Sequence, residues 1–180
     1  MSSTTSFAPP RQTDTDKDDG APTLGDHATK DDSAPSPTSR ISAEEAKLYY
    51  YGLPSRPVLV ARTTTTPWEM PTGPEVYLKP KELRVVGRHK IVDVWNDNMA
   101  GKVFAILDEN KVQVTSIDLV RFGYYPGEPS GGVIVWIGVQ PGSLSQEGGH
   151  DVAHQCKRVL SDNGLTDVDV EIRESIVYRG

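Results

Sequence analysis

The segment with the sharpest chemical meaning is His150-Asp151-Val152-Ala153-His154, which places two histidines one helical turn apart. Enzymes with the H-E-x-x-H motif bind zinc through two such imidazoles, and their glutamate activates a metal-bound water. Here Asp151 stands where that glutamate would be, and its side chain is shorter. Helical periodicity also places both histidines away from the apolar face, toward solvent. We therefore assign no metal ligand from this motif.

The candidate nucleophiles have structural explanations. Cys156 falls on the apolar face of the same helix, where a thiol is buried and stays protonated. Ser143 and Ser145 follow a Pro-Gly turn, but the segment lacks the glycine pattern of a nucleophile elbow. Ser143 and Gln146 have the spacing of a capping box, and this predicts a helix start. No Walker lysine or G-x-G-x-x-G pattern indicates a phosphate site. We assign no catalytic and no cofactor-binding residue.

Several acids near the C-terminus, together with Asp118, suggest a magnesium site of the kind that nucleases use. These are Asp118, Asp167, Asp169, Glu171 and Glu174. The usual lysine two positions after the acid is missing, because Glu171 is followed by Arg173. A solvated strand face also explains alternating charge, and we favour it. The basic run Lys79 to Lys90 has interleaved apolar residues, which favours a helix approach over a nucleic-acid interface.

The elements that position these residues are clearest toward the C-terminus. Val133 to Val139 is rich in β-branched residues and predicts a central strand covered on both faces. A helix should follow and end at Asn163-Gly164, burying Val152, Ala153, Cys156, Val159 and Leu160. In the last strand, apolar and charged residues alternate from Val168 to Arg173. This pattern predicts one buried face and one solvated face.

The remaining elements complete the predicted fold. Ser42 and Glu45 have capping-box spacing and open a short helix that reaches three tyrosines, residues 49–51. A strand at residues 58–61, a long helix that ends at Asn110 and a strand at 112–124 follow, the last as a hairpin with the central strand. The order predicts an α+β fold of the split βαβ, ferredoxin-like class, with a four-stranded sheet and two helices. A mixed sheet of another order is the alternative, because the loop after the first strand is long.

Composition limits the class of protein. The chain has 180 residues, a net charge of −6 and one cysteine. Its pI near 5.2 does not favour general binding to nucleic acid or to an anionic membrane. Nothing resembles a secretion signal or a membrane span, so we expect an intracellular protein of the cytoplasm or nucleus. Residues 1–40 carry seven acids and four bases with one aromatic, and predict a disordered tail before a single domain, 41–180.

Several segments resemble a family of uncharacterised intracellular proteins from mushroom-forming fungi. The matching segments are Leu53-Pro54-Ser55-Arg56-Pro57, Thr66-Pro67-Trp68-Glu69, Pro71-Thr72-Gly73-Pro74-Glu75, Lys79-Pro80-Lys81-Glu82-Leu83-Arg84, Trp136-Ile137-Gly138-Val139-Gln140-Pro141-Gly142-Ser143-Leu144-Ser145 and Asp169-Val170-Glu171-Ile172-Arg173-Glu174-Ser175. The resemblance implies a leading module that, in longer members, precedes a trypsin-like fold. This chain lacks the Gly-Thr-Gly-Gly segment of that second module, so no peptidase residue is carried over. The resemblance names no activity.

Two functional hypotheses follow. The first is a non-enzymatic intracellular module that binds a protein partner through loops 54–74 and 124–132, or that acts as the N-terminal regulatory domain of a larger protein. The second is a metal-dependent hydrolase or nucleic-acid-processing domain that uses acids such as Asp118 and Glu171. We favour the first, with no cofactor, and leave the oligomeric state open.

Overall fold

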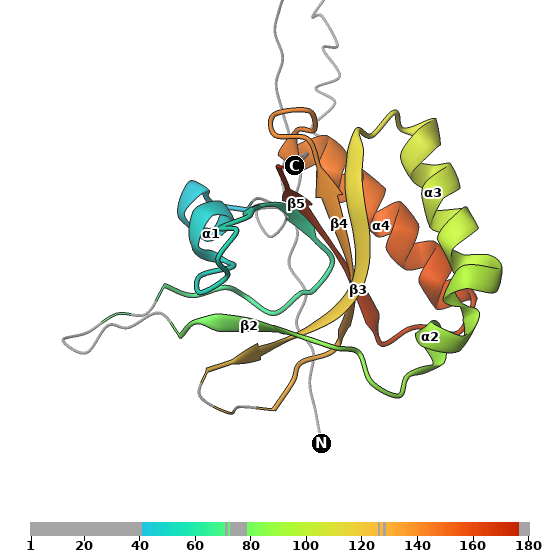
Figure 1. The fold of residues 1–180 in the computed structure, drawn as a ribbon. Helices are drawn as coiled ribbons and strands as arrows, with labels where there is room; N and C mark the ends of the chain where they lie inside the picture. The colour runs from blue at the N-terminus through green and yellow to red at the C-terminus, as the bar shows by residue number, and fades with distance from the viewer. Residues whose placement is uncertain (1–40, 71, 73–78, 126, 128, 177–180) are drawn as a thin grey trace, which may run out of the picture. The chain divides into compact units, whose positions relative to one another are not determined.

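A five-stranded mixed sheet organises the chain in a computed structural model (Figure 1). The structure describes residues 41–70, 72, 79–125, 127 and 129–176. All of them belong to one compact unit, Pro35–Gly180. The predicted disordered tail, residues 1–40, lies outside the described residues.

The elements alternate between strands and helices along the chain. In order they are α1 (Ala43–Leu48), β1 (Val58–Arg62), β2 (Lys81–Arg84), α2 (Lys90–Val94), the π-helical turn η2 (Trp95–Met99), α3 (Ala100–Glu109), β3 (Val114–Tyr124), β4 (Val133–Val139), α4 (Gln146–Asp162) and β5 (Val168–Glu174). None of these described helices is long and apolar enough to cross a membrane.

The strands lie in the order β1-β5-β4-β3-β2. β4 and β5 are parallel, joined by α4, whereas the other neighbouring pairs are antiparallel. Every residue of β4 is buried, as its β-branched sequence predicts for a central strand. The predicted hairpin between β3 and β4 is also confirmed.

The predicted four-stranded ferredoxin-like sheet is wrong, because a fifth strand is present and the order differs. β2 is the strand that the sequence did not reveal, since Lys81-Glu82-Leu83-Arg84 contains one apolar residue and no alternation. It pairs with the end of β3, from Arg121 to Tyr124. β4 reaches only Arg121 in its pairing with β3, so β3 extends beyond β4. The alternative, a mixed sheet of another order, is the arrangement found.

Helices cover both faces of the sheet. α3 and α4 lie on one face, and α1 lies on the other (Figure 1). The core on the α1 side consists of Tyr50, Leu53, Leu59, Val120, Phe122, Ile134 and Trp136. Because α1 covers this face, Glu171 and Arg173 of β5 are buried. The prediction of a solvated face on β5 is therefore wrong.

α4 follows its predicted pattern except at its first turn. Val152, Ala153, Cys156 and Leu160 are buried against the sheet, as predicted. The N-cap is Ser145, whose Oγ accepts a hydrogen bond from the N–H of Gly148. The predicted cap at Ser143 is wrong, because the Ser143 hydroxyl donates to the carbonyl of Gln140 in the preceding turn. α4 approaches β1 closely at Gly149, where a Cβ would lie 2.8 Å from Cγ1 of Val60.

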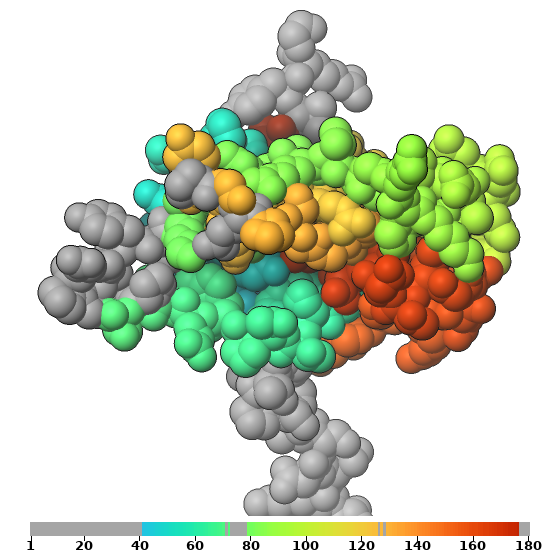
Figure 2. Space-filling view, turned by 90° about the horizontal axis from the view of Figure 1, so that it is seen from below, coloured from blue at the N-terminus to red at the C-terminus, as the bar shows by residue number. Residues whose placement is uncertain are grey.

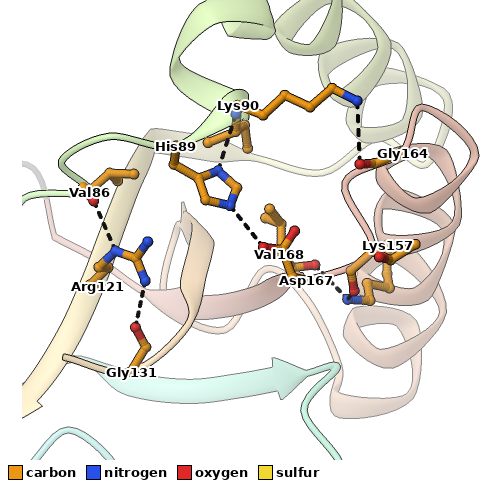
Figure 3. A network of polar contacts seen from close by, with 11 residues as sticks. Val86, His89, Lys90, Arg121, Gly131, Lys157, Gly164, Asp167 and Val168 are labelled. Atoms are coloured by element: carbon orange, nitrogen blue, oxygen red, sulfur yellow. Dashed lines mark hydrogen bonds and ion pairs between the residues drawn. The ribbon is translucent and has the colours of Figure 1, made fainter. Parts of the chain in front are cut away.

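The predicted long helix is present as α2, η2 and α3, and Asn110 caps it as expected. A polar network fixes its first turn (Figure 3). Nδ1 of His89 accepts the N–H of Ile91, and its Nε2 lies 3.0 Å from Oδ2 of Asp167. The Arg121 guanidinium, on β3, donates to the carbonyls of Val86 and Gly131. These contacts join the start of α2 to the loops at this end of the sheet.

Candidate functional site

A pocket of about 550 Å³ opens beside β1, which is an edge strand of the sheet. Its walls come from three parts of the chain. They are residues 60–65 with Pro67 and Trp68, then Ile41 before α1 and Glu45 within it, and Gln146, His150 and His154 from α4. The segment after β1 lies on the surface (Figure 2). We call this the edge pocket.

The lining shows that the edge pocket faces the rim of the sheet and not one of its faces. Of the lining residues of β1, Ala61 packs into the main core, whereas Arg62 reaches Glu45 of α1 on the other face. α1 and α4, which also line it, lie on opposite faces of the sheet (Figure 1). Only the rim of the strand is accessible from both sides. The pocket therefore contacts the backbone rim of β1.

Among the residues that the structure describes, β1 has a strand partner on one side only. The N–H of Thr63 donates to the carbonyl of Val170 across the β1–β5 pair, at 3.0 Å. Bonded and non-bonded residues alternate in an antiparallel pair, so the N–H and C=O of Arg62 point away from β5. Within the described part of the chain, no other strand pairs with this side of β1. With respect to the described residues, these two groups lie where an incoming strand would pair.

A shielded ion pair forms one wall of the edge pocket. Nε of Arg62 lies 2.8 Å from Oε1 of Glu45, and the two side chains are 12% and 11% exposed. The Arg62 guanidinium also donates to the carbonyl of Thr64. This pair joins α1 to β1 and fixes the segment that follows the strand. Breaking the pair would leave a shielded charge without a partner, which is costly. The pair therefore keeps this wall in one geometry.

Two histidines form the opposite wall. The imidazole centroids of His150 and His154 are 4.2 Å apart. Desolvation, and next the neighbouring His150, lower the pKa of His154. The prediction that both side chains face solvent holds for His154, which is exposed, but only in part for His150, which is half-buried; both line the edge pocket. The helical pattern locates them relative to the apolar face of α4, but it does not show that β1 and its following segment lie beside that face.

Behind the edge pocket lies a buried polar cluster centred on Glu171, which is 1% exposed. Its carboxylate accepts hydrogen bonds from the hydroxyls of Tyr49, at 2.7 Å, and Tyr50, at 2.8 Å. Burial raises the pKa of Glu171. Nζ of Lys81 lies 3.2 Å from the ring centroid of Tyr49, and burial lowers its pKa to about 8. The cluster anchors α1 to the sheet.

The acids that suggested a magnesium site are not brought together. Each has a partner within the protein: Tyr49 and Tyr50 for Glu171, Arg173 for Asp118, His89 for Asp167, Thr63 and Lys157 for Asp169, and the N–H of Gly142 for Glu174. Among the residues that the structure describes, no three His, Cys, Asp or Glu side chains form a group able to hold a metal ion. Cys156 is buried, and its burial raises the thiol pKa to about 12.

The sequence did not identify the residues that shape the edge pocket on the side of α1. Glu45 carries a weak signal, since it is the acid of a capping box, and Arg62 carries one as the charge that ends an apolar strand. Neither signal reveals that the two side chains meet. Of the three adjacent tyrosines, Tyr50 is buried and Tyr51 is 47% exposed, which confirms that they point to different sides.

Comparisons of the chain with protein-family models, with curated proteins and with solved structures found no match. The resemblance to the fungal family therefore stays an expectation.

Proposed function

We propose that the chain is a non-enzymatic module that binds an extended segment of a partner protein along the outer rim of β1. The observation that carries the proposal is that the edge pocket lies against β1, an edge strand, and is lined by α1 and α4 from opposite faces of the sheet. An extended peptide that adds a strand to a sheet edge needs this arrangement: free backbone groups with pockets for alternate side chains beside them. The N–H and C=O of Arg62 supply the backbone groups.

The side chains of the pocket suit such a peptide. Successive residues of an added strand point alternately to the two faces of the sheet. One set would point toward the α1 side, where Ile41 and the Arg62–Glu45 pair lie, and the other toward the histidines of α4. Trp68 and Pro67 add apolar surface. A volume of about 550 Å³ is within the usual range for ligand pockets.

The frame around β1 makes recognition selective. An exposed strand edge pairs with many chains unless neighbouring structure limits access. Here α1, α4 and the segment 63–68 flank the outer rim, so an incoming strand must fit between them. The Arg62–Glu45 pair and the tyrosine–Glu171 cluster hold that frame in place.

The two loops predicted as a docking surface have different positions relative to the edge pocket. Loop 54–74 supplies Thr63, Thr64, Thr65, Pro67 and Trp68 to its lining. Loop 124–132 supplies none of its described residues to this pocket. We therefore place the partner segment at the first loop, and a role for the second loop stays a prediction. The hypothesis of a regulatory domain in a larger protein is compatible with the same binding mode.

The proposal is tested by selecting peptides from a random phage-displayed library on the full chain. Binding is then measured for Gln146→Trp, which adds a large ring inside the edge pocket, and for Glu147→Trp, which adds the same ring at the next exposed position of α4. We expect Gln146→Trp to abolish binding and Glu147→Trp to preserve it. Selected peptides that bind both variants equally would contradict the proposal, as would a library that yields no binder.

A further inference from the structure

His150 and His154 lie side by side on α4. They stand four residues apart on α4, where side chains lie on the same side one turn apart. Their ring centroids are 4.2 Å apart with a tilt of 45° between the rings. Both rings line the edge pocket, so the space in front of them is open to a small ligand.

We infer that His150 and His154 form a two-ligand site for a divalent transition-metal ion such as Zn²⁺, Ni²⁺ or Cu²⁺. Imidazole nitrogen is a preferred ligand of these ions, whereas Mg²⁺ and Ca²⁺ require oxygen ligands. Two imidazoles one helical turn apart can reach one ion through small rotations of their side chains. The ion would lie on the wall of the edge pocket.

A carboxylate lies beside one of the two rings. Oδ1 of Asp151 lies 3.6 Å from Nδ1 of His150. A carboxylate on that side of the ring leaves Nε2 to face the ion.

The protein supplies two ligands and leaves the other positions open. No third His, Cys, Asp or Glu of the described residues joins the pair in a metal-binding group. Structural zinc sites have four protein ligands and catalytic ones have three, so this site should bind more weakly than either. Water, or a side chain of a bound partner, would complete the coordination. The inference does not depend on the proposed function, because an ion can bind whether or not a partner does.

The test is calorimetric titration of the untagged full chain with Zn²⁺ at neutral pH. The decisive variant combines His154→Gln with Arg158→His, which keeps four histidines but separates the helical pair by eight residues, about 12 Å along the axis. Arg158 is exposed, so the change leaves the core intact. The matched control is His27→Gln, which removes a histidine outside the described residues.

We expect one Zn²⁺ per chain, unchanged by His27→Gln and weakened on the order of tenfold or more in the double variant. The Cu²⁺-loaded protein should show an electron paramagnetic resonance signal with two nitrogen ligands, and the double variant should lose it. The inference is overturned if no saturable binding occurs, or if the double variant binds as tightly as the unaltered chain. A loss of affinity in His27→Gln would place the ion elsewhere and would also overturn it.

Discussion

The Glu171 carboxylate connects α1 to the sheet through two tyrosine hydroxyls. It is buried in a face of β5 that α1 covers, so the two hydroxyl donors offset the cost of removing the carboxylate from water. Arg62 lies opposite Glu171 in the register of β1 and β5, and its side chain forms an ion pair with Glu45 on α1. The same contacts therefore hold the frame of the edge pocket.

Removing one donor from Glu171 should destabilise the fold. Tyr50→Phe keeps the buried ring but leaves one carboxylate oxygen without the hydroxyl that lies 2.8 Å away. We expect a loss of roughly 1–3 kcal/mol in the free energy of unfolding, measured by urea denaturation. Tyr51→Phe is the control, since this neighbouring tyrosine is 47% exposed and should tolerate the change. Equal stability of the two variants would contradict the role of the cluster.

Lys81 should make stability depend on alkaline pH. Its pKa is about 8 in the folded state and 10.5 in an unperturbed side chain, so between these values the unfolded state binds more protons. Stability contributed by this group must then rise with pH, by about 2 kcal/mol between pH 7 and pH 9.5. The measurement is the free energy of unfolding at both pH values for the unaltered chain and for Lys81→Met. A gain of the same size in both proteins would show that Lys81 is not its source.

The burial of a single residue could be predicted from the sequence where its position on an apolar face decides it. The burial of Cys156 followed from its position on the apolar face of α4. The burial of Glu171 did not follow, because alternation of apolar and charged residues is the usual mark of a half-exposed strand. Its partners, Tyr49 and Tyr50, lie more than 100 residues earlier in the chain, at separations of 122 and 121. Local pattern carries no information on such a contact.

Among the elements, α4 and β1 pack against each other beside the edge pocket. Both line it, and Gly149 of α4 lies close to Val60 of β1. β1 has a bulge between Leu59 and Ala61, so Val60 is an extra residue that packs into the main core together with Ala61. A glycine in α4 is what allows that packing.

A methyl group at Gly149 should separate α4 from β1. Its Cβ would lie 2.8 Å from Cγ1 of Val60, so the helix or the strand must shift. We expect Gly149→Ala to lower the free energy of unfolding by about 1–3 kcal/mol, although the same change usually stabilises a helix. Gly101→Ala in α3 is the control, because nothing lies within 4 Å of its new Cβ, and it should stabilise by about 0.5–1 kcal/mol. Stabilisation by both changes in thermal or urea unfolding would show that the close approach does not matter.

Element prediction worked where local signals agreed and failed where a tertiary contact makes the element. Strand β4, the apolar face of α4 and the caps at Ser42 and Asn110 were all visible in the sequence. β2 has no such signal, and it is a strand because the end of β3 offers it a partner. The turn η2 inside the long helix likewise has no signature in the apolar spacing.

At the scale of the whole molecule, the sheet order decides which strand has a free edge. The ferredoxin-like prediction failed because it lacked β2 and could not determine the neighbours of β1. Strand order depends on pairings between segments distant in sequence, such as β1 with β5, and single-sequence patterns do not specify them. Of the candidate site, the sequence singled out the loop 54–74 and the two histidines. It did not predict that they lie together beside the outer rim of β1.

Amide hydrogen exchange, measured by NMR on the full chain with and without a selected peptide, tests directly whether a partner strand pairs with the outer rim of β1. If a partner strand pairs with β1, exchange of the Arg62 N–H should slow by about tenfold or more on binding. The Thr63 N–H already donates to Val170 and should change little. Saturation with peptide that leaves the Arg62 rate unchanged would contradict recognition at the edge of β1.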